Sequence, residues 1–142
     1  MIDLNNYGGY PYEICLNVHP VDRGWFPEMI SDLCCLHSMM FSLRAFVDRD
    51  ESASHDQLSH LARFHYAQTL QLLQTRLNEF DKTSAISDTT IMTVITLAMA
   101  AEVTKDFAAV DTHLKGLGKI VSLRGGVRAL NTYNNMQVKV CR

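Results

Sequence analysis

Apolar residues recur at the spacing of an α-helix along most of this chain, and the first such segment covers residues 31–49. One stripe in it has intervals of four, three and four residues; its members are Leu36, Met40, Leu43 and Val47. Such spacing is typical of one buried helical face. Ser31 is placed to cap the helix, and Asp32 lies where a negative charge favours the helix dipole. The pattern predicts a helix over 31–49 whose core side is this stripe.

A second stripe predicts a helix that begins at Ser54 and ends at residues 81–84. Ser54 and Gln57 have the spacing of a capping box, in which each side chain reaches the other's backbone N–H. The stripe consists of Ala62, Tyr66, Leu70, Leu73, Leu77 and Phe80. Because it keeps its spacing for nearly three heptads, we expect this side of the helix to be buried.

The third segment begins at Ser87 and is apolar almost all round. Between residues 91 and 103 the polar side chains are Thr93, Thr96 and Glu102. A helix that is apolar on every side packs against several neighbours, so this one is predicted to be central. The run is shorter than the about 20 residues that cross a membrane, so no membrane association is expected.

A fourth helix is predicted from Asp106 to Leu123 or Arg124. One apolar stripe consists of Phe107, Val110, Leu114, Leu117 and Val121, and a second of His113, Gly116, Ile120 and Leu123. Glycine inside a helix costs about 0.5–1 kcal/mol relative to alanine, so Gly116 is predicted to let a neighbouring helix come close.

Glycine also marks the end of this helix. Gly125 is the expected left-handed stop, and Val127 is placed to pack back on the last turn. A fifth helix, with Asn134 as its cap, has barely begun where the sequence reaches Arg142.

The segments together predict an all-α fold. We expect an antiparallel helical bundle or array of about four long helices plus a truncated fifth, because no segment alternates like a strand and the links are short. Glycines and prolines punctuate residues 1–30, which are predicted to be an irregular N-terminal segment. Residues 31–142 are predicted to form the helical domain, which we expect to be incomplete at its C-terminal end. Trp25-Phe26-Pro27 is expected to tuck against the first helix.

Composition supports a globular chain and gives no field that attracts nucleic acid. Apolar residues make up 47% and charged residues 20%, with a formal net charge of −2. Residues 1–104 carry 13 acidic and 6 basic side chains, whereas residues 105–142 carry 2 acidic and 7 basic ones. Two interpretations stay open: the acidic part packs beside the basic part, or the basic part is a surface for a partner or for DNA phosphates.

Candidate metal and catalytic residues do not form recognisable sites. His55, His60 and His65 are spaced by five, which turns each about 140° from the last on a helix, so they do not converge on one ion. Paired C-x-x-C motifs, a G-x-S-x-G elbow and a phosphate-binding loop are absent from the sequence. We therefore expect no cofactor, no metal and no enzymatic activity.

His113, Cys35 and Arg124 nevertheless have alternative interpretations. An enzyme using His113 or Cys35 would need a polar pocket in which one of them meets a base or an acid. The structural interpretation makes His113 a packed core residue and Arg124 a C-terminal cation that favours the helix dipole.

Short motifs along the chain occur in a recognisable order. They are Trp25-Phe26-Pro27, Leu36-His37, His65-Tyr66 with Arg76-Leu77, Ser87-Asp88 with Thr90-Ile91, and Gly116 with Leu123-Arg124-Gly125-Gly126. Over residues 25–142 this series resembles the helical regulatory region of fungal-specific transcription factors. His113 matches the histidine of a family step whose usual glycine and tryptophan are absent here.

The resemblance implies a non-catalytic regulatory and interaction module that acts on transcription in the nucleus through protein partners. The residues it marks are structural: Trp25, Phe26, Pro27, His113, Gly116, Arg124, Gly125 and Gly126. In the family a six-cysteine binuclear zinc cluster precedes this region, and the four cysteines at positions 15, 34, 35 and 141 cannot build one. Direct DNA binding by this chain is therefore not expected. The alternative is a stand-alone helical adaptor or scaffold unrelated to transcription, dimeric through its C-terminal helix.

Overall fold

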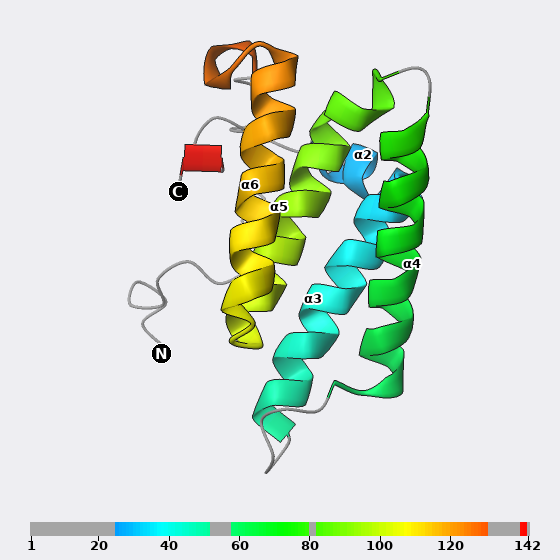
Figure 1. Cartoon of the computed structure of the whole chain (residues 1–142). Helices are drawn as coiled ribbons and strands as arrows, with labels where there is room; N and C mark the ends of the chain where they lie inside the picture. Colours follow the sequence, from blue (N-terminus) through cyan, green and yellow to red (C-terminus); the bar gives the residue numbers. More distant parts are fainter. Residues whose placement is uncertain (1–24, 52–57, 80–81, 131–139, 142) are drawn as a thin grey trace, which may run out of the picture.

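The computed structural model describes residues 25–51, 58–79, 82–130 and 140–141, and its regular elements are helices throughout these ranges (Figure 1). The α-helices are α2 (Trp25–Ser31), α3 (Leu33–Glu51), α4 (His60–Asn78), α5 (Asp88–Val103) and α6 (Phe107–Arg124). Two short 3-10 helices are η2 (Ser84–Ile86) and η3 (Val127–Ala129). The predicted all-α class is confirmed.

The four long helices form two antiparallel hairpins that lie side by side. One hairpin pairs α3 with α4 and the other pairs α5 with α6, while α3 also packs against α5. Figure 1 shows α3 and α5 in the middle, running in the same direction, with α4 and α6 on the two outer sides. Among the described residues no helix is long and apolar enough to cross a membrane.

The central helix α5 supplies much of the core, as predicted. Ser87 caps it, because its hydroxyl accepts from the backbone N–H of Thr90. Most of its residues are buried, including two threonines that interrupt the apolar run. Their hydroxyls donate to carbonyls one turn earlier, Thr93 to Thr89 and Thr96 to Met92, at 2.8 Å each. Burial therefore leaves these polar groups satisfied.

Helix formation begins earlier than the sequence predicted. Residues 25–31 form α2, so the described end of the supposedly irregular segment 1–30 is helical, whereas residues 1–24 lie outside the described ranges. Ser31 is the last residue of α2 and does not cap α3. Its hydroxyl instead donates to the Glu28 carbonyl at 3.0 Å. Asp32 is the capping residue of α3, because its carboxylate accepts from the Cys35 N–H at 3.0 Å.

The predicted buried stripe of α3 is wrong, because its members face solvent. Met40, Leu43 and Val47 are 41%, 42% and 37% exposed, and Leu36 is half-buried. The buried side is the opposite one; it consists of Cys34, Cys35, Ser38, Met39, Phe41, Ser42 and Ala45. Apolar residues have helical spacing on both sides of α3. The side with the smaller residues allows α4 and α5 to pack closer to α3.

Helix α4 also differs from the prediction at its start and on its surface. Its N-cap is Ser59, whose hydroxyl accepts from the Ala62 N–H, so the helix does not begin at Ser54. In the predicted stripe Ala62 and Leu73 are buried and Tyr66 is half-buried. Leu70 and Leu77 are exposed, and Phe80 lies outside the described residues.

Helix α6 has the predicted limits but buries fewer of the predicted residues. Asp106 caps its start and Gly125 its end. Leu117, Ile120 and Val121 are buried, whereas the predicted stripe members Phe107, Leu114 and Leu123 are exposed. After the stop, Leu130 rather than Val127 enters the core.

The predicted close approach at Gly116 is wrong for the described residues, and most of the predicted fifth helix lies outside them. A methyl group at Gly116 would meet no atom of the described residues within 4 Å, so none of the described helices approaches this position closely. Asn134 lies outside the described residues. Val140 and Cys141 are helical, and Val140 packs against the core.

Candidate functional site: a polar cluster and an apolar outer face

Arg124, from the most specific of the sequence motifs, ties the end of α6 to the start of α5. Its guanidinium forms an ion pair with Asp88, and both side chains are about one fifth exposed. It also donates to the Ile86 carbonyl at 3.2 Å. These partners lie in η2 and in the first turn of α5. Arg124 was predicted to interact with the dipole of its own helix. The structure shows that it also contacts the neighbouring helix α5 directly.

Gly125 and Gly126 form the turn that ends α6. Their φ angles are 109° and 87°, in the left-handed region where side chains are disfavoured. The Gly125 N–H donates to the Ser122 carbonyl and the Gly126 N–H to the Val121 carbonyl, at 3.1 Å and 2.9 Å. This pair of bonds is a Schellman motif, which satisfies two carbonyls at the end of the helix. The two glycines therefore have a structural role, which is to end α6.

A second tie at the same end of the array centres on Asp32. Its carboxylate accepts two hydrogen bonds from Arg76 of α4, at 3.0 Å and 2.9 Å, and one from the Thr89 hydroxyl of α5, at 2.7 Å. Arg76 donates further to the Thr90 hydroxyl at 3.0 Å. We call Asp32, Arg76, Thr89, Thr90 and Ser87 the polar cluster. It joins the ends of α3, α4 and α5.

Electrostatics favour the charged form of Asp32. Burial raises the pKa of this carboxyl, but the hydrogen bonds from Arg76, the Cys35 amide and Thr89 outweigh burial and lower the pKa overall. A charged carboxylate that is fully hydrogen-bonded serves as a structural tie. Its ionisable partner in these contacts is Arg76, whose guanidinium donates to it.

The other predicted site residues do not gather at the polar cluster. His113 is half-buried on α6; burial lowers the pKa of its imidazole, and Asp106 partly opposes that effect. Pro27 is exposed in the first turn of α2. Trp25 and Phe26 begin α2, and their side chains lie outside what the structure describes. The family-like residues therefore lie in two helices, α2 and α6, and in the turn that follows α6.

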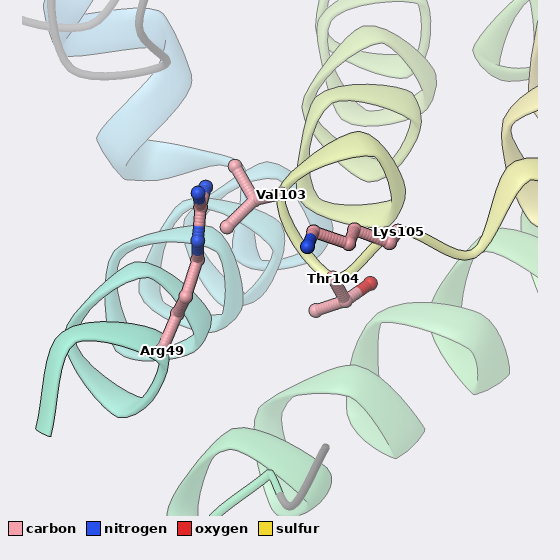
Figure 2. Close-up of a pocket in the computed structure, with 4 residues that line it drawn as sticks. All are labelled: Arg49, Val103, Thr104 and Lys105. Carbon is pink, nitrogen blue, oxygen red and sulfur yellow. The ribbon is translucent and has the colours of Figure 1, made fainter. Parts of the chain in front are cut away.

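A small pocket at the opposite end of the array is lined by Arg49, Val103, Thr104 and Lys105. Figure 2 shows Arg49 reaching from α3 toward Val103, with Lys105 on the far side of the pocket. Its volume is about 70 Å³, whereas pockets for small organic ligands measure roughly 300–1,000 Å³. The pocket has room for a few water molecules.

Thiol and metal chemistry find little support among the described residues. Within that part of the chain no three His, Cys, Asp or Glu side chains come together to hold an ion. Cys34 and Cys35 are buried in the core, and burial raises the pKa of the Cys34 thiol. A raised pKa disfavours the thiolate, which is the reactive form. Cys35 is fully buried in the hydrophobic core.

Exposed apolar side chains lie along one side of α3 and in the first turns of α4. We call this surface the outer face; it consists of Leu33, Met40, Leu43 and Val47 of α3 with Leu61 and Phe64 of α4. Phe64 lies beside α3, because its ring packs edge-on against the His37 ring with centroids 6.0 Å apart. The interval pattern of Leu36, Met40, Leu43 and Val47 is that of a coiled-coil seam. The same spacing is visible in the sequence, where it was interpreted as a buried side of the helix.

His37 and His65 are a contact that the sequence interpretation missed. Their Nδ1 atoms lie 2.9 Å apart, across α3 and α4, beside Phe64. The two residues are separated by 28 positions, so only the packing of the helices reveals the pair.

The amino-acid sequence of this chain matches the model of a known family. The model of the fungal-specific transcription factor domain matches residues 23–139, which includes all the long helices. No curated protein and no solved structure matches the chain.

Proposed function

The chain belongs to the family of fungal-specific transcription factor domains, and we propose that it is a non-catalytic interaction module that regulates transcription in the nucleus by binding protein partners. Family membership supports the role in transcription. The binding of protein, rather than catalysis or direct contact with DNA, is our inference from the arrangement of the side chains.

The outer face is the observation that carries this proposal. Apolar side chains at five successive heptad-like positions, Leu33, Leu36, Met40, Leu43 and Val47, line one side of α3, and four of them are exposed. Contiguous exposed apolar surface is characteristic of sites that bind protein. The alternating intervals of three and four residues suit an α-helix as the partner, because coiled-coil packing inserts side chains at this spacing.

The signature residues support the non-catalytic part of the proposal. Arg124 is engaged by Asp88 and the Ile86 carbonyl, and Gly125 and Gly126 end α6. Each of these residues has a role inside the fold. The net charge of −2 also favours protein over nucleic acid as the partner, since DNA binding draws on an excess of basic side chains.

A reporter assay tests the proposal. The whole chain is fused to a heterologous DNA-binding domain, and transcription from the matching promoter is compared with that of the DNA-binding domain alone. We expect the fusion to raise or lower transcription. The double variant Met40→Asp, Leu43→Asp should lose most of this effect, because charges on the outer face oppose the burial of apolar surface against a partner.

Leu114→Asp provides the matched control, because Leu114 is an exposed apolar residue of α6 outside the outer face. It should retain the effect of the unmodified fusion. Circular dichroism of the isolated chains establishes that all variants keep their helices. A fusion with no effect, or an outer-face variant with full effect, would contradict the proposal.

A further inference from the structure

Two imidazoles meet where α3 and α4 pack together. The Nδ1 atoms of His37 and His65 are 2.9 Å apart, and the ring centroids are 5.1 Å apart with a tilt of 45°. Both residues are half-buried. At this separation one nitrogen donates a hydrogen bond and the other accepts it.

The contact tolerates one proton between the two nitrogens and opposes a second. When both rings are protonated, every ring nitrogen is a donor, so the hydrogen bond is lost. Two positive charges then lie about 3 Å apart in a partly desolvated setting, where their repulsion is only weakly screened.

The surrounding groups do not offset this repulsion. Of the carboxylates nearest along α3 on either side of His37, Asp32 is held by Arg76, and Asp48 is held by Arg44 and the Ser59 amide. On α4 the remaining titratable neighbours include His60, Arg63 and Tyr66, which carry no negative charge at neutral pH.

The other helices against α3 are α2 and α5. The ionisable residue of α2 is Glu28, which is exposed. In α5 the ionisable residues are Asp88 and Glu102, one at each end of the helix. Among the described hydrogen bonds and ion pairs, none joins either imidazole to a carboxylate. Burial, and then the charge of His37, lower the pKa of His65.

We propose that the His37–His65 contact is a proton-sensitive link that holds α4 against α3 at neutral pH and releases it in mild acid. The opening is local, because the α3–α5 and α5–α6 contacts contain no comparable pair among the described residues. Phe64 of the outer face contacts both rings, so opening rearranges that face. The inference stands on the helix contact and does not depend on the proposed partner.

Hydrogen exchange between pH 7.5 and 5.5 tests this inference on the full chain, with a chelator present so that the nitrogens report protons alone. After correction for the intrinsic rates, protection of the α4 amides should fall by up to about tenfold per pH unit, the limit for one additional proton.

His37→Gln leaves one titrating ring in the contact and should remove most of the response of α4. His113→Gln is the matched control, because burial also lowers the pKa of His113 but its ring lies on α6; this variant should keep the response of α4. An equal response of α4 in wild type and His37→Gln would overturn the inference.

Histidine titration by NMR in the unmodified protein gives a second reading that needs no variant. The His65 ring should titrate below the usual histidine range, because burial and the His37 ring beside it oppose its protonation. A His65 titration at the usual histidine pKa would also overturn the inference.

Discussion

Buried hydroxyl groups are a recurrent feature of this helical array at the scale of single residues. Ser38, Thr93 and Thr96 each donate to a carbonyl of the preceding turn, at 2.7–2.8 Å. Ser42 is different: it is 3% exposed, and its hydroxyl has no hydrogen-bond partner within the part of the chain that the structure describes. An unsatisfied buried hydroxyl loses the free energy of hydration without compensation.

Ser42→Ala should therefore stabilise the protein relative to Ser38→Ala. Both substitutions remove a buried hydroxyl from α3 and gain the same helix propensity, so their difference isolates the satisfied hydrogen bond of Ser38. We expect about 1 kcal/mol between the two variants. Urea unfolding followed by circular dichroism measures it, and Ser38→Ala being the more stable variant would contradict the assignment.

Asp32 has a larger expected effect because three helices depend on its charge. Asp32→Asn weakens the bonds to Arg76 and should cost about 2–3 kcal/mol. The folded-state pKa is lowered, so the stabilising contribution of Asp32 is complete above its unfolded pKa of about 4 and is lost as pH falls through the folded value. The variant should accordingly show a flatter decline of stability in acid.

Asp111→Asn is the control for this comparison. Asp111 pairs with Lys115 on the surface, where the two side chains are 62% and 76% exposed, and such pairs contribute at most about 1 kcal/mol. Unfolding midpoints measured between pH 2.5 and 7 compare the two variants. Equal losses of stability would show that the polar cluster is no more important than a surface pair.

At the scale of elements, α6 contains glycines in two opposite situations. Gly116 has helical geometry and open space where a methyl group would lie, whereas Gly125 has a φ of 109° and would place its methyl group 3.3 Å from the Ala129 Cβ. Gly125 is required by its conformation, and Gly116 is tolerated without a packing role in the isolated chain.

Alanine at these two positions should change stability in opposite directions. Gly116→Ala should stabilise by about 0.5–1 kcal/mol, because alanine loses less backbone entropy in a helix. Gly125→Ala should destabilise by about 1–2 kcal/mol, because a left-handed conformation is costly for a residue with a Cβ. Thermal unfolding of both variants provides the measurement, and the same sign for both would contradict the structure of α6.

Local signals explain which elements the sequence could predict. The starts of α5 and α6 and the end of α6 follow from Ser87, Asp106 and Gly125, each of which acts on its own helix end. The buried side of α3 could not be chosen in this way, because small residues on one side compete with larger apolar residues on the other. The choice depends on α4 and α5.

The candidate site shows the same division. The glycine turn is a local motif and was predicted, whereas the partner of Arg124 was not, because 36 residues of sequence separate it from Asp88. The His37–His65 contact and the outer face are likewise set by how α3 and α4 pack together. Sequence spacing alone identifies such contacts only after the neighbouring helices are known.

At the scale of the whole molecule, histidines set the response of stability to pH. Burial lowers the pKa of both His65 and His113, so the unfolded chain binds more protons than the folded one below its histidine pKa of about 6.5. The free energy of unfolding should therefore be constant above that pH and fall as pH decreases through the folded values.

Denaturant unfolding at a series of pH values between 5 and 8 measures this dependence. His65→Gln and His113→Gln should each make the decline shallower, and the two together more so, because the rings lie on different helices. A stability that rises toward pH 5 in the unmodified protein would have the wrong sign.

Arg124 belongs to the family signature, and its ion pair with Asp88 holds α6 against the central helix α5. We therefore assign Arg124 a structural role. A double-mutant cycle with Arg124→Ala and Asp88→Ala tests this role most directly. For a partly buried ion pair we expect a coupling of about 1–2 kcal/mol in the free energy of unfolding. A coupling indistinguishable from zero would show that Arg124 does not tie the helices together, and would return it to the candidates for binding a partner.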